Sequence, residues 1–128
     1  MNEVEFILYV EDQERSKAFY QELLGKSPCL DVPGMTEFEL NDHTRLGLMP
    51  NQGIATIICG PMPAPDTGTG IPRCELYLRF SDAGKTMKLA QNLGAKLVSE
   101  LSDRNWGDCV GYLADPDGHI IAIVEKKK

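Results

Sequence analysis

At 128 residues the chain is long enough for one ordinary domain and too short for two independent domains of typical size. Its net charge of −6 argues against nucleic acid, whose binding depends on clustered Lys and Arg, and no apolar run approaches the roughly 20 residues that span a bilayer. The N-terminus shows no signal-peptide pattern, and the four cysteines form no C-x-x-C pair. We therefore expect a cytoplasmic protein with reduced thiols and with neither a membrane nor a nucleic-acid partner.

The first predicted element is a strand over residues 5–10, followed by a helix. Side chains alternate between the two faces of a strand, which places Glu5, Ile7 and Tyr9 on one face. The other face is apolar throughout and is predicted to pack on a helix; it consists of Phe6, Leu8 and Val10. Asp12 is a typical N-cap for that helix and Gly25 a typical C-terminal stop.

Three short strands are predicted next, over residues 27–32, 35–40 and 44–49, separated by Pro33-Gly34 and Asn41-Asp42 turns. The first half of the chain is thus β-α-β-β-β. Residues 51–72 contain a short apolar run and then repeated Pro and Gly, which break regular structure, so we interpret them as a connector.

The second half repeats the first. The sequence from Glu5 to Val10 recurs from Glu75 to Phe80, an offset of 75 − 5 = 70 residues, and Asp82 takes the place of Asp12. Strands are predicted over residues 73–80, 96–101, 109–114 and 119–125, with a helix after Asp82. The last two strands are joined by the turn Asp115-Pro116-Asp117-Gly118. We expect one domain over residues 1–128, built of module one (1–50), the connector and module two (73–128).

Two motifs carry a resemblance to a known superfamily. Asp12-x-x-Arg15-Ser16-x-x-Phe19-Tyr20, ending in Leu24-Gly25, resembles the opening of vicinal-oxygen-chelate proteins, which include glyoxalase I, bleomycin-resistance proteins and extradiol dioxygenases. Asp115-Pro116-Asp117-Gly118-His119 is similar to their usual ending, and Trp106-Gly107-Asp108 looks like the bleomycin-resistance branch. The resemblance implies an α+β fold of two tandem β-α-β-β-β modules, whose curved mixed sheet forms a cleft, within a homodimer.

The resemblance also implies positions for a divalent metal. They fall at Glu5, Gly47, Glu75 and Ala122, and only the two glutamates can bind a metal. The usual site therefore looks degraded, and we expect no cofactor, with a divalent metal held by Glu5 and Glu75 as the alternative. Neutralisation of these carboxylates by Arg45 or Arg79, or exposure to solvent, would be the purely structural explanation.

Several other side chains are predicted on the same face as the glutamates, or in a loop at its mouth. Aromatic rings, a thioether and a guanidinium would suit a flat or amphipathic organic molecule. The predicted ligand-binding residues are Glu5, Tyr9, Met49, Glu75, Tyr77, Arg79 and Trp106.

The favoured hypothesis is a protein that binds a small organic molecule, with cationic compounds included because the site is acidic. The alternative is a metal-dependent lyase or isomerase of the glyoxalase type, similar to lactoylglutathione lyase, in which Glu75 is catalytic. A third reading has no ligand, and the domain then acts only through its dimer surface.

Overall fold

A computed structural model describes residues 1–127, which form two compact units. The first unit is Met1–Thr69 and the second begins at Gly70. The change from one to the other falls inside the segment that the sequence marks as a connector.

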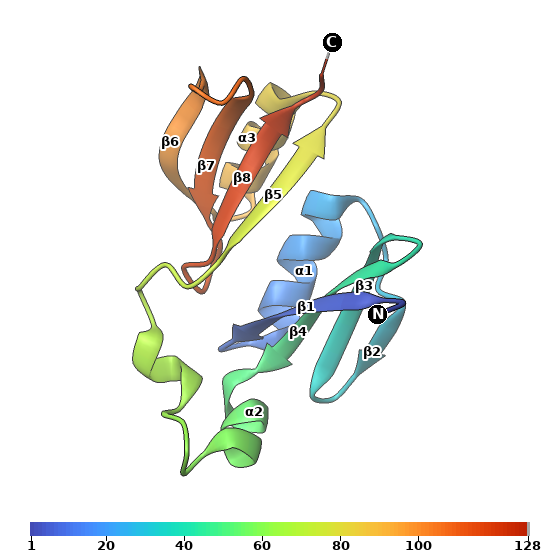
Figure 1. The fold of residues 1–128 in the computed structure, drawn as a ribbon, viewed down its shortest axis with the longest axis vertical. Coiled ribbons are helices and arrows are strands. Elements are labelled where there is room, and N and C mark those ends of the chain that lie inside the picture. Colours follow the sequence, from blue (N-terminus) through green and yellow to red (C-terminus); the bar gives the residue numbers. More distant parts are fainter. Residues whose placement is uncertain (128) are drawn as a thin grey trace. The chain divides into compact units, whose positions relative to one another are not determined.

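The first unit is a four-stranded sheet with one helix against it (Figure 1). Strand β1 runs parallel to β4, and the remaining pairs are antiparallel, in the spatial order β1-β4-β3-β2. Its elements are β1 (Val4–Val10), α1 (Gln13–Leu24), β2 (Leu30–Val32), β3 (Met35–Asn41) and β4 (Thr44–Pro50).

The second unit has the same order of elements and the same strand pairing, β5-β8-β7-β6. It comprises β5 (Glu75–Phe80), α3 (Ala83–Asn92), β6 (Lys96–Asp103), β7 (Cys109–Ala114) and β8 (Ile120–Glu125). The predicted α+β class and the two β-α-β-β-β modules are confirmed, with each module forming a mixed sheet of its own.

The two helices start in the same way. The Asp12 carboxylate accepts a hydrogen bond from the Arg15 N–H at 3.1 Å, and Asp82 does the same for Lys85 at 3.1 Å. Each side chain satisfies one of the donors that a helix N-terminus leaves unpaired. Helix α1 ends at Gly25, whose φ of 65° is the left-handed conformation that glycine adopts without strain.

The core of the first unit lies between α1 and the sheet. Phe19 and Tyr20 of α1 are buried in edge-to-face contact, with ring centroids 5.0 Å apart, and Leu8 and Val10 of β1 are buried as predicted. The prediction for Phe6 is wrong, because 57% of this side chain is exposed. Helix α1 packs mainly against β3 and β4, whereas β1 lies at the edge of the sheet. The first half of β1, which includes Phe6, is therefore not packed under α1.

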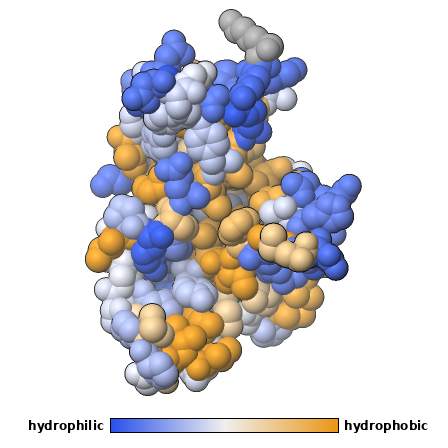
Figure 2. Space-filling view, viewed as in Figure 1, coloured by the Kyte–Doolittle hydropathy of each residue, from blue (hydrophilic) through white to orange (hydrophobic). Residues whose placement is uncertain are grey.

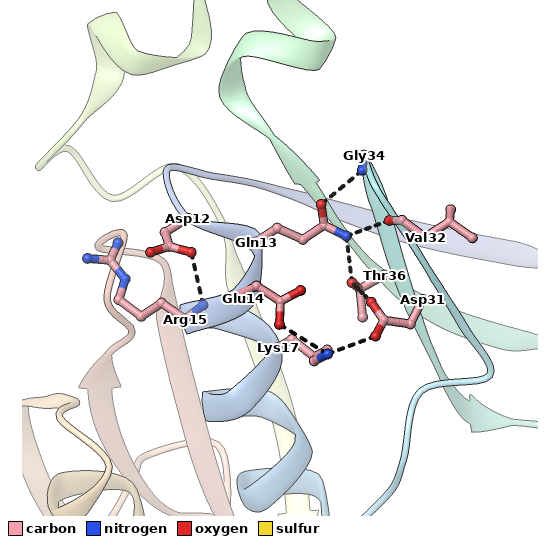
Figure 3. Close-up of polar contacts among 9 residues, drawn as sticks. All are labelled: Asp12, Gln13, Glu14, Arg15, Lys17, Asp31, Val32, Gly34 and Thr36. Atoms are coloured by element: carbon pink, nitrogen blue, oxygen red, sulfur yellow. Dashed lines mark hydrogen bonds and ion pairs between the residues drawn. The ribbon is translucent and has the colours of Figure 1, made fainter.

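Gln13 ties the start of α1 to the hairpin between β2 and β3 (Figure 3). Its Nε2 donates to the Val32 carbonyl at 2.8 Å and to Thr36 Oγ1 at 2.9 Å, while its Oε1 accepts from the Gly34 N–H at 2.9 Å. These three hydrogen bonds hold the turn against the start of α1, and Lys17 of the same helix adds a contact with Asp31 at 2.7 Å.

The connector contains regular structure that the sequence reading did not anticipate. Helix α2 (Asn51–Ile58) comes before the first proline of the segment, so no ring interrupts its backbone, and the short 3-10 helix η1 (Pro65–Gly68) follows. Apolar surface gathers at α2 in Figure 2, where Ile57 is 71% exposed. No helix within residues 1–127 is long and apolar enough to cross a membrane.

Candidate functional site

The sheet face opposite α1 carries the acidic candidate. In the pairing of β1 with β4, Glu5 lies opposite Arg45, Ile7 opposite Gly47, and Tyr9 opposite Met49. Strand β3 adds Glu37, which pairs with Gly47 on its other side. Because Gly47 has no side chain, the middle of this face is open at the level of Ile7 and Glu37.

The Glu5 side chain occupies the space above Gly47. A Cβ placed on Gly47 would overlap Glu5 Oε2, and it would lie 3.2 Å from Ile7 Cγ1 and 3.4 Å from Met35 Sδ. Glu5 therefore reaches from the edge strand across β4 towards Glu37. Among residues 1–127, Glu5 Oε2 is a buried side-chain oxygen that receives no hydrogen bond from an N–H group or a hydroxyl group, and the Glu5 carboxyl group can bond to Glu37 only when one of the two is protonated.

This placement makes the Glu5 carboxylate hard to ionise. Burial is the main cause, followed by the hydrogen bond and the negative charge of Glu37, and together with Glu3 they outweigh the nearby Arg45 to raise the pKa of Glu5 from 4.5 to about 7. Two carboxyl groups in contact cannot both ionise cheaply, so they share a proton more readily than separate groups would. Near neutral pH, Glu5 is thus ready to gain or lose a proton.

Arg45 does not fully neutralise this face. It lies 3.2 Å from Glu37 and 3.6 Å from Glu3, so its guanidinium is paired with those two carboxylates. The structural explanation of neutralisation by arginine holds for Glu37 but leaves Glu5 with its raised pKa. Glu37 is the residue that sequence reasoning missed at this site.

The second module presents a different set on the face opposite α3. Trp106 Nε1 donates to Tyr77 Oη at 2.9 Å, and Tyr77 in turn donates to Asp108 Oδ2. Arg79 binds the same carboxylate, with its Nη2 3.1 Å from Asp108 Oδ2. Three predicted ligand residues, Tyr77, Arg79 and Trp106, are therefore brought together by Asp108, which was not predicted.

An apolar floor adjoins this cluster. Ala122 pairs with Tyr77 and Val124 with Arg79, so both lie on the same face, and both are fully buried together with Val110. Tyr112 packs against this floor, and the Arg104 guanidinium lies 5.2 Å from the centre of its ring.

Glu75 is placed differently from Glu5. It opens β5 opposite Ile120 and is exposed to solvent. Glu5 and Glu75 belong to different units, and the cleft that would hold both stays a prediction.

The residues at the metal positions do not form a donor set. Gly47 and Ala122 offer no ligand atom, and within residues 1–127 no three His, Cys, Asp or Glu side chains converge as a metal would require. Of the two glutamates at these positions, Glu5 is the one with close charged neighbours. These neighbours are the carboxyl group of Glu37 and the guanidinium of Arg45. We derive no chemistry through a metal from this arrangement.

Comparison with known proteins identifies the family. A family profile described as "Glyoxalase-like domain" matches residues 4–127. Uncharacterized proteins of Mycobacterium bovis and Mycobacterium tuberculosis are 29% identical over 115 residues, which is 88% of this chain and 75% and 67%, respectively, of those proteins.

Solved structures share the fold at low sequence identity. A glyoxalase-related enzyme from Fulvimarina pelagi superposes with a TM-score of 0.81 at 22% identity, covering 98% of this chain and 89% of that one. A lactoylglutathione lyase from Agrobacterium tumefaciens gives 0.69 at 20% identity, covering 95% and 91%. The chain belongs to the glyoxalase-like domain family, whose profile spans nearly all of it, and it shares its fold with these solved structures.

Proposed function

We propose that this protein binds a small organic molecule that carries an amine, and that Glu5 anchors the amine. The observation that carries the proposal is Glu5 Oε2, a buried acceptor beside Glu37 that has no hydrogen-bond donor among the described residues once both carboxyl groups are ionised. A carboxylate held away from water costs several kcal/mol unless something pairs with it. An ammonium group would supply both the missing donor and the missing charge.

The neighbours of Glu5 suit such a ligand. Glu37 offers a second carboxylate within reach of the same ammonium, while Ile7, with 41% of its surface exposed, offers apolar contact beside it. Tyr9 and Met49 continue the face along β1 and β4. A mostly apolar surface with a few convergent polar groups is the usual character of a small-molecule site.

Binding of benzylamine, measured by calorimetry at pH 8 where Glu5 is ionised, tests the proposal. We expect the wild type to bind benzylamine more tightly than uncharged benzyl alcohol. Glu5→Gln should raise the dissociation constant for benzylamine about ten- to a hundredfold, because a charge-assisted hydrogen bond is lost. Glu22→Gln, which removes an exposed carboxylate from α1, is the matched control and should bind as the wild type does. Equal affinities of the wild type and Glu5→Gln for benzylamine would refute the role of Glu5.

A second candidate is a lyase or isomerase of the glyoxalase type. The observation that favours it is the pKa of Glu5, raised to about 7, because a general base works best when its pKa is close to the working pH. Glu5 rather than Glu75 would then move the proton. Exchange of the α-proton of a glutathione hemithioacetal into deuterium oxide, lost in Glu5→Gln, would support this function, and elemental analysis of the same protein would report any divalent ion.

A further inference from the structure

The loop between β6 and β7 folds against β5 and joins four side chains into one cluster. Trp106 and Asp108 come from the loop, and Tyr77 and Arg79 come from β5. Tyr77 Oη accepts from Trp106 and donates to Asp108, so the position of one ring depends on the other. We call this set the Asp108 cluster.

Asp108 binds both polar groups that β5 presents here. Arg79 Nη1 lies 3.3 Å from Asp108 Oδ1 and Nη2 lies 3.1 Å from Oδ2, and Nη1 also donates to the Glu125 carbonyl at 2.9 Å. The guanidinium therefore makes a bidentate contact with the carboxylate, which is the strongest geometry for such a pair. The Asp108 side chain is 14% exposed and the Arg79 side chain is 35% exposed, so solvent screens the contact in part.

Asp108 stays charged at neutral pH. The hydrogen bond from Tyr77, followed by that from Arg79, holds the pKa of the Asp108 carboxyl below its usual value. The positive charge of Arg79 is thus cancelled locally.

The two rings, in contrast, remain available. Trp106 is 56% exposed and Tyr77 is 41% exposed, although each has its polar atom hydrogen-bonded inside the cluster. What the four residues offer to a ligand is aromatic surface on which the charge of Arg79 is neutralised, and Lys127, whose positive charge also lowers the pKa of Asp108, lies near the cluster. A ring of this kind attracts an organic cation through its negative face.

We propose that Asp108 is the specificity-determining residue of this face: it neutralises Arg79 and fixes Tyr77 and Trp106, so that the face accepts aromatic cations and disfavours aromatic anions. This inference rests on the proposed small-molecule binding and adds the charge preference and the residue that sets it. Asp108 acts through its neighbours and is a positioning residue. Replacing its carboxylate with an amide would release Arg79 to pair with an anionic ligand.

The test compares two aromatic ions of opposite charge, benzyltrimethylammonium and benzoate, in the wild type and in Asp108→Asn. Binding is followed by the fluorescence of Trp106, which is the only tryptophan of the chain. The wild type should bind the ammonium ion more tightly, and Asp108→Asn should shift the ratio of the two dissociation constants towards benzoate by about tenfold or more, since one charge-assisted hydrogen bond becomes available. The double variant Asp108→Asn with Arg79→Gln should lose the gain for benzoate.

A second measurement needs no ligand. Asp108→Ala and Tyr77→Phe should both increase quenching of Trp106 by acrylamide and lower its fluorescence anisotropy, because each removes an oxygen from the hydrogen-bonded chain that holds the ring. Glu100→Gln, an exposed change on β6, should leave both values as they are.

The outcomes separate this inference from the proposed function. Benzylamine binding that depends on Glu5, together with an unchanged ion preference in Asp108→Asn, would overturn the inference and leave the proposed function in place. Unaltered quenching and anisotropy of Trp106 in Asp108→Ala would overturn the positioning role. Failure of benzylamine and of both aromatic ions to bind the wild type would overturn the two proposals together.

Discussion

Two glycines that lie in strands test which sheet face is packed and which is open. Gly47 lies on the face opposite α1, and Gly111 of β7 lies on the face that packs against α3. Neither has a positive φ, so alanine suits the backbone at both positions. The two substitutions add the same methyl group to strands of the same kind, and they should nevertheless differ in effect.

At Gly111 the methyl group meets the core. A Cβ there would lie 2.6 Å from Met87 Cε, 2.7 Å from Met87 Sδ and 3.3 Å from Leu101 Cγ, and Met87 is only 6% exposed. Overfilling a packed interior lowers the free energy of unfolding by about 1–3 kcal/mol. Alanine in place of glycine raises it by about 0.4–1 kcal/mol, because alanine reduces the conformational entropy of the unfolded chain. We expect Gly111→Ala to lower the free energy of unfolding by about 1–2 kcal/mol.

At Gly47 the methyl group meets the end of a flexible side chain. Glu5 can rotate away from it into solvent, so the gain from the unfolded chain remains, and we expect Gly47→Ala to change stability by about 0 to +1 kcal/mol. The displaced carboxylate should also lose its contact with Glu37 and its burial, which lowers the pKa of Glu5 from about 7.

Urea denaturation of the two variants gives the stabilities, and a carboxyl ¹³C NMR titration of Glu5 gives its pKa. If Gly47→Ala loses as much stability as Gly111→Ala, the face opposite α1 is packed rather than open. If the variant unfolds normally and the pKa of Glu5 stays near 7, the Glu5 side chain does not lie above Gly47. Either result would refute the site as described.

Three further changes test the acid pair and the helix starts. A carboxyl group whose pKa is raised in the folded state binds its proton more tightly there, so the wild type should lose about 1 kcal/mol of stability, an amount reduced by solvent access, as the pH rises from 4.5 through 7. In urea titrations at several pH values, Glu37→Gln should remove part of this dependence and leave the part that comes from burial, which is the larger cause. Gln13→Ala should cost about 1–2 kcal/mol and speed hydrogen exchange at the Gly34 amide, and an unchanged exchange rate would contradict its anchoring role. Asp12→Ala should cost about 1 kcal/mol in thermal unfolding, since the N-cap is lost.

Most of the fold could be predicted from local signals that the chain carries twice. Asp12 and Asp82 mark the helix starts because capping depends on a single side chain and the next turn of backbone. The position of Phe6 could not be predicted in the same way. Period-two alternation assigns a face but does not say where along the strand the helix stops covering it, which depends on packing against β3 and β4.

The candidate site could be predicted only in part. The face of Glu5, Tyr9 and Met49 follows from strand alternation, and the pairing of β1 with β4 agrees with it. Glu37 and Asp108 were missed because neither is placed by its own neighbours in sequence. Glu37 reaches Glu5 across β4, and Asp108 reaches Arg79 from a loop, so both contacts need the strand register that a single sequence does not contain.

The two modules place unlike residues at matching positions, and this explains why an internal repeat predicts a scaffold better than a site. The offset of 70 residues relates Glu5 to Glu75, and pairing in the sheets relates Gly47 to Ala122. In the first module Gly47 pairs with Glu37 of β3, and in the second module Ala122 pairs with Tyr112 of β7.

The consequence is a different environment for the same glutamate. In the first module the missing side chain at Gly47 lets Glu5 approach a second carboxyl group, which helps to raise its pKa to about 7. In the second module the methyl group of Ala122 belongs to a buried apolar floor with Tyr112, and Glu75 is exposed to solvent instead. A carboxylate at a matching position is therefore a candidate for binding or proton transfer only where the residue beside it leaves room and the strand beyond supplies a partner, and on this ground Glu5, not Glu75, is the residue on which to test function first.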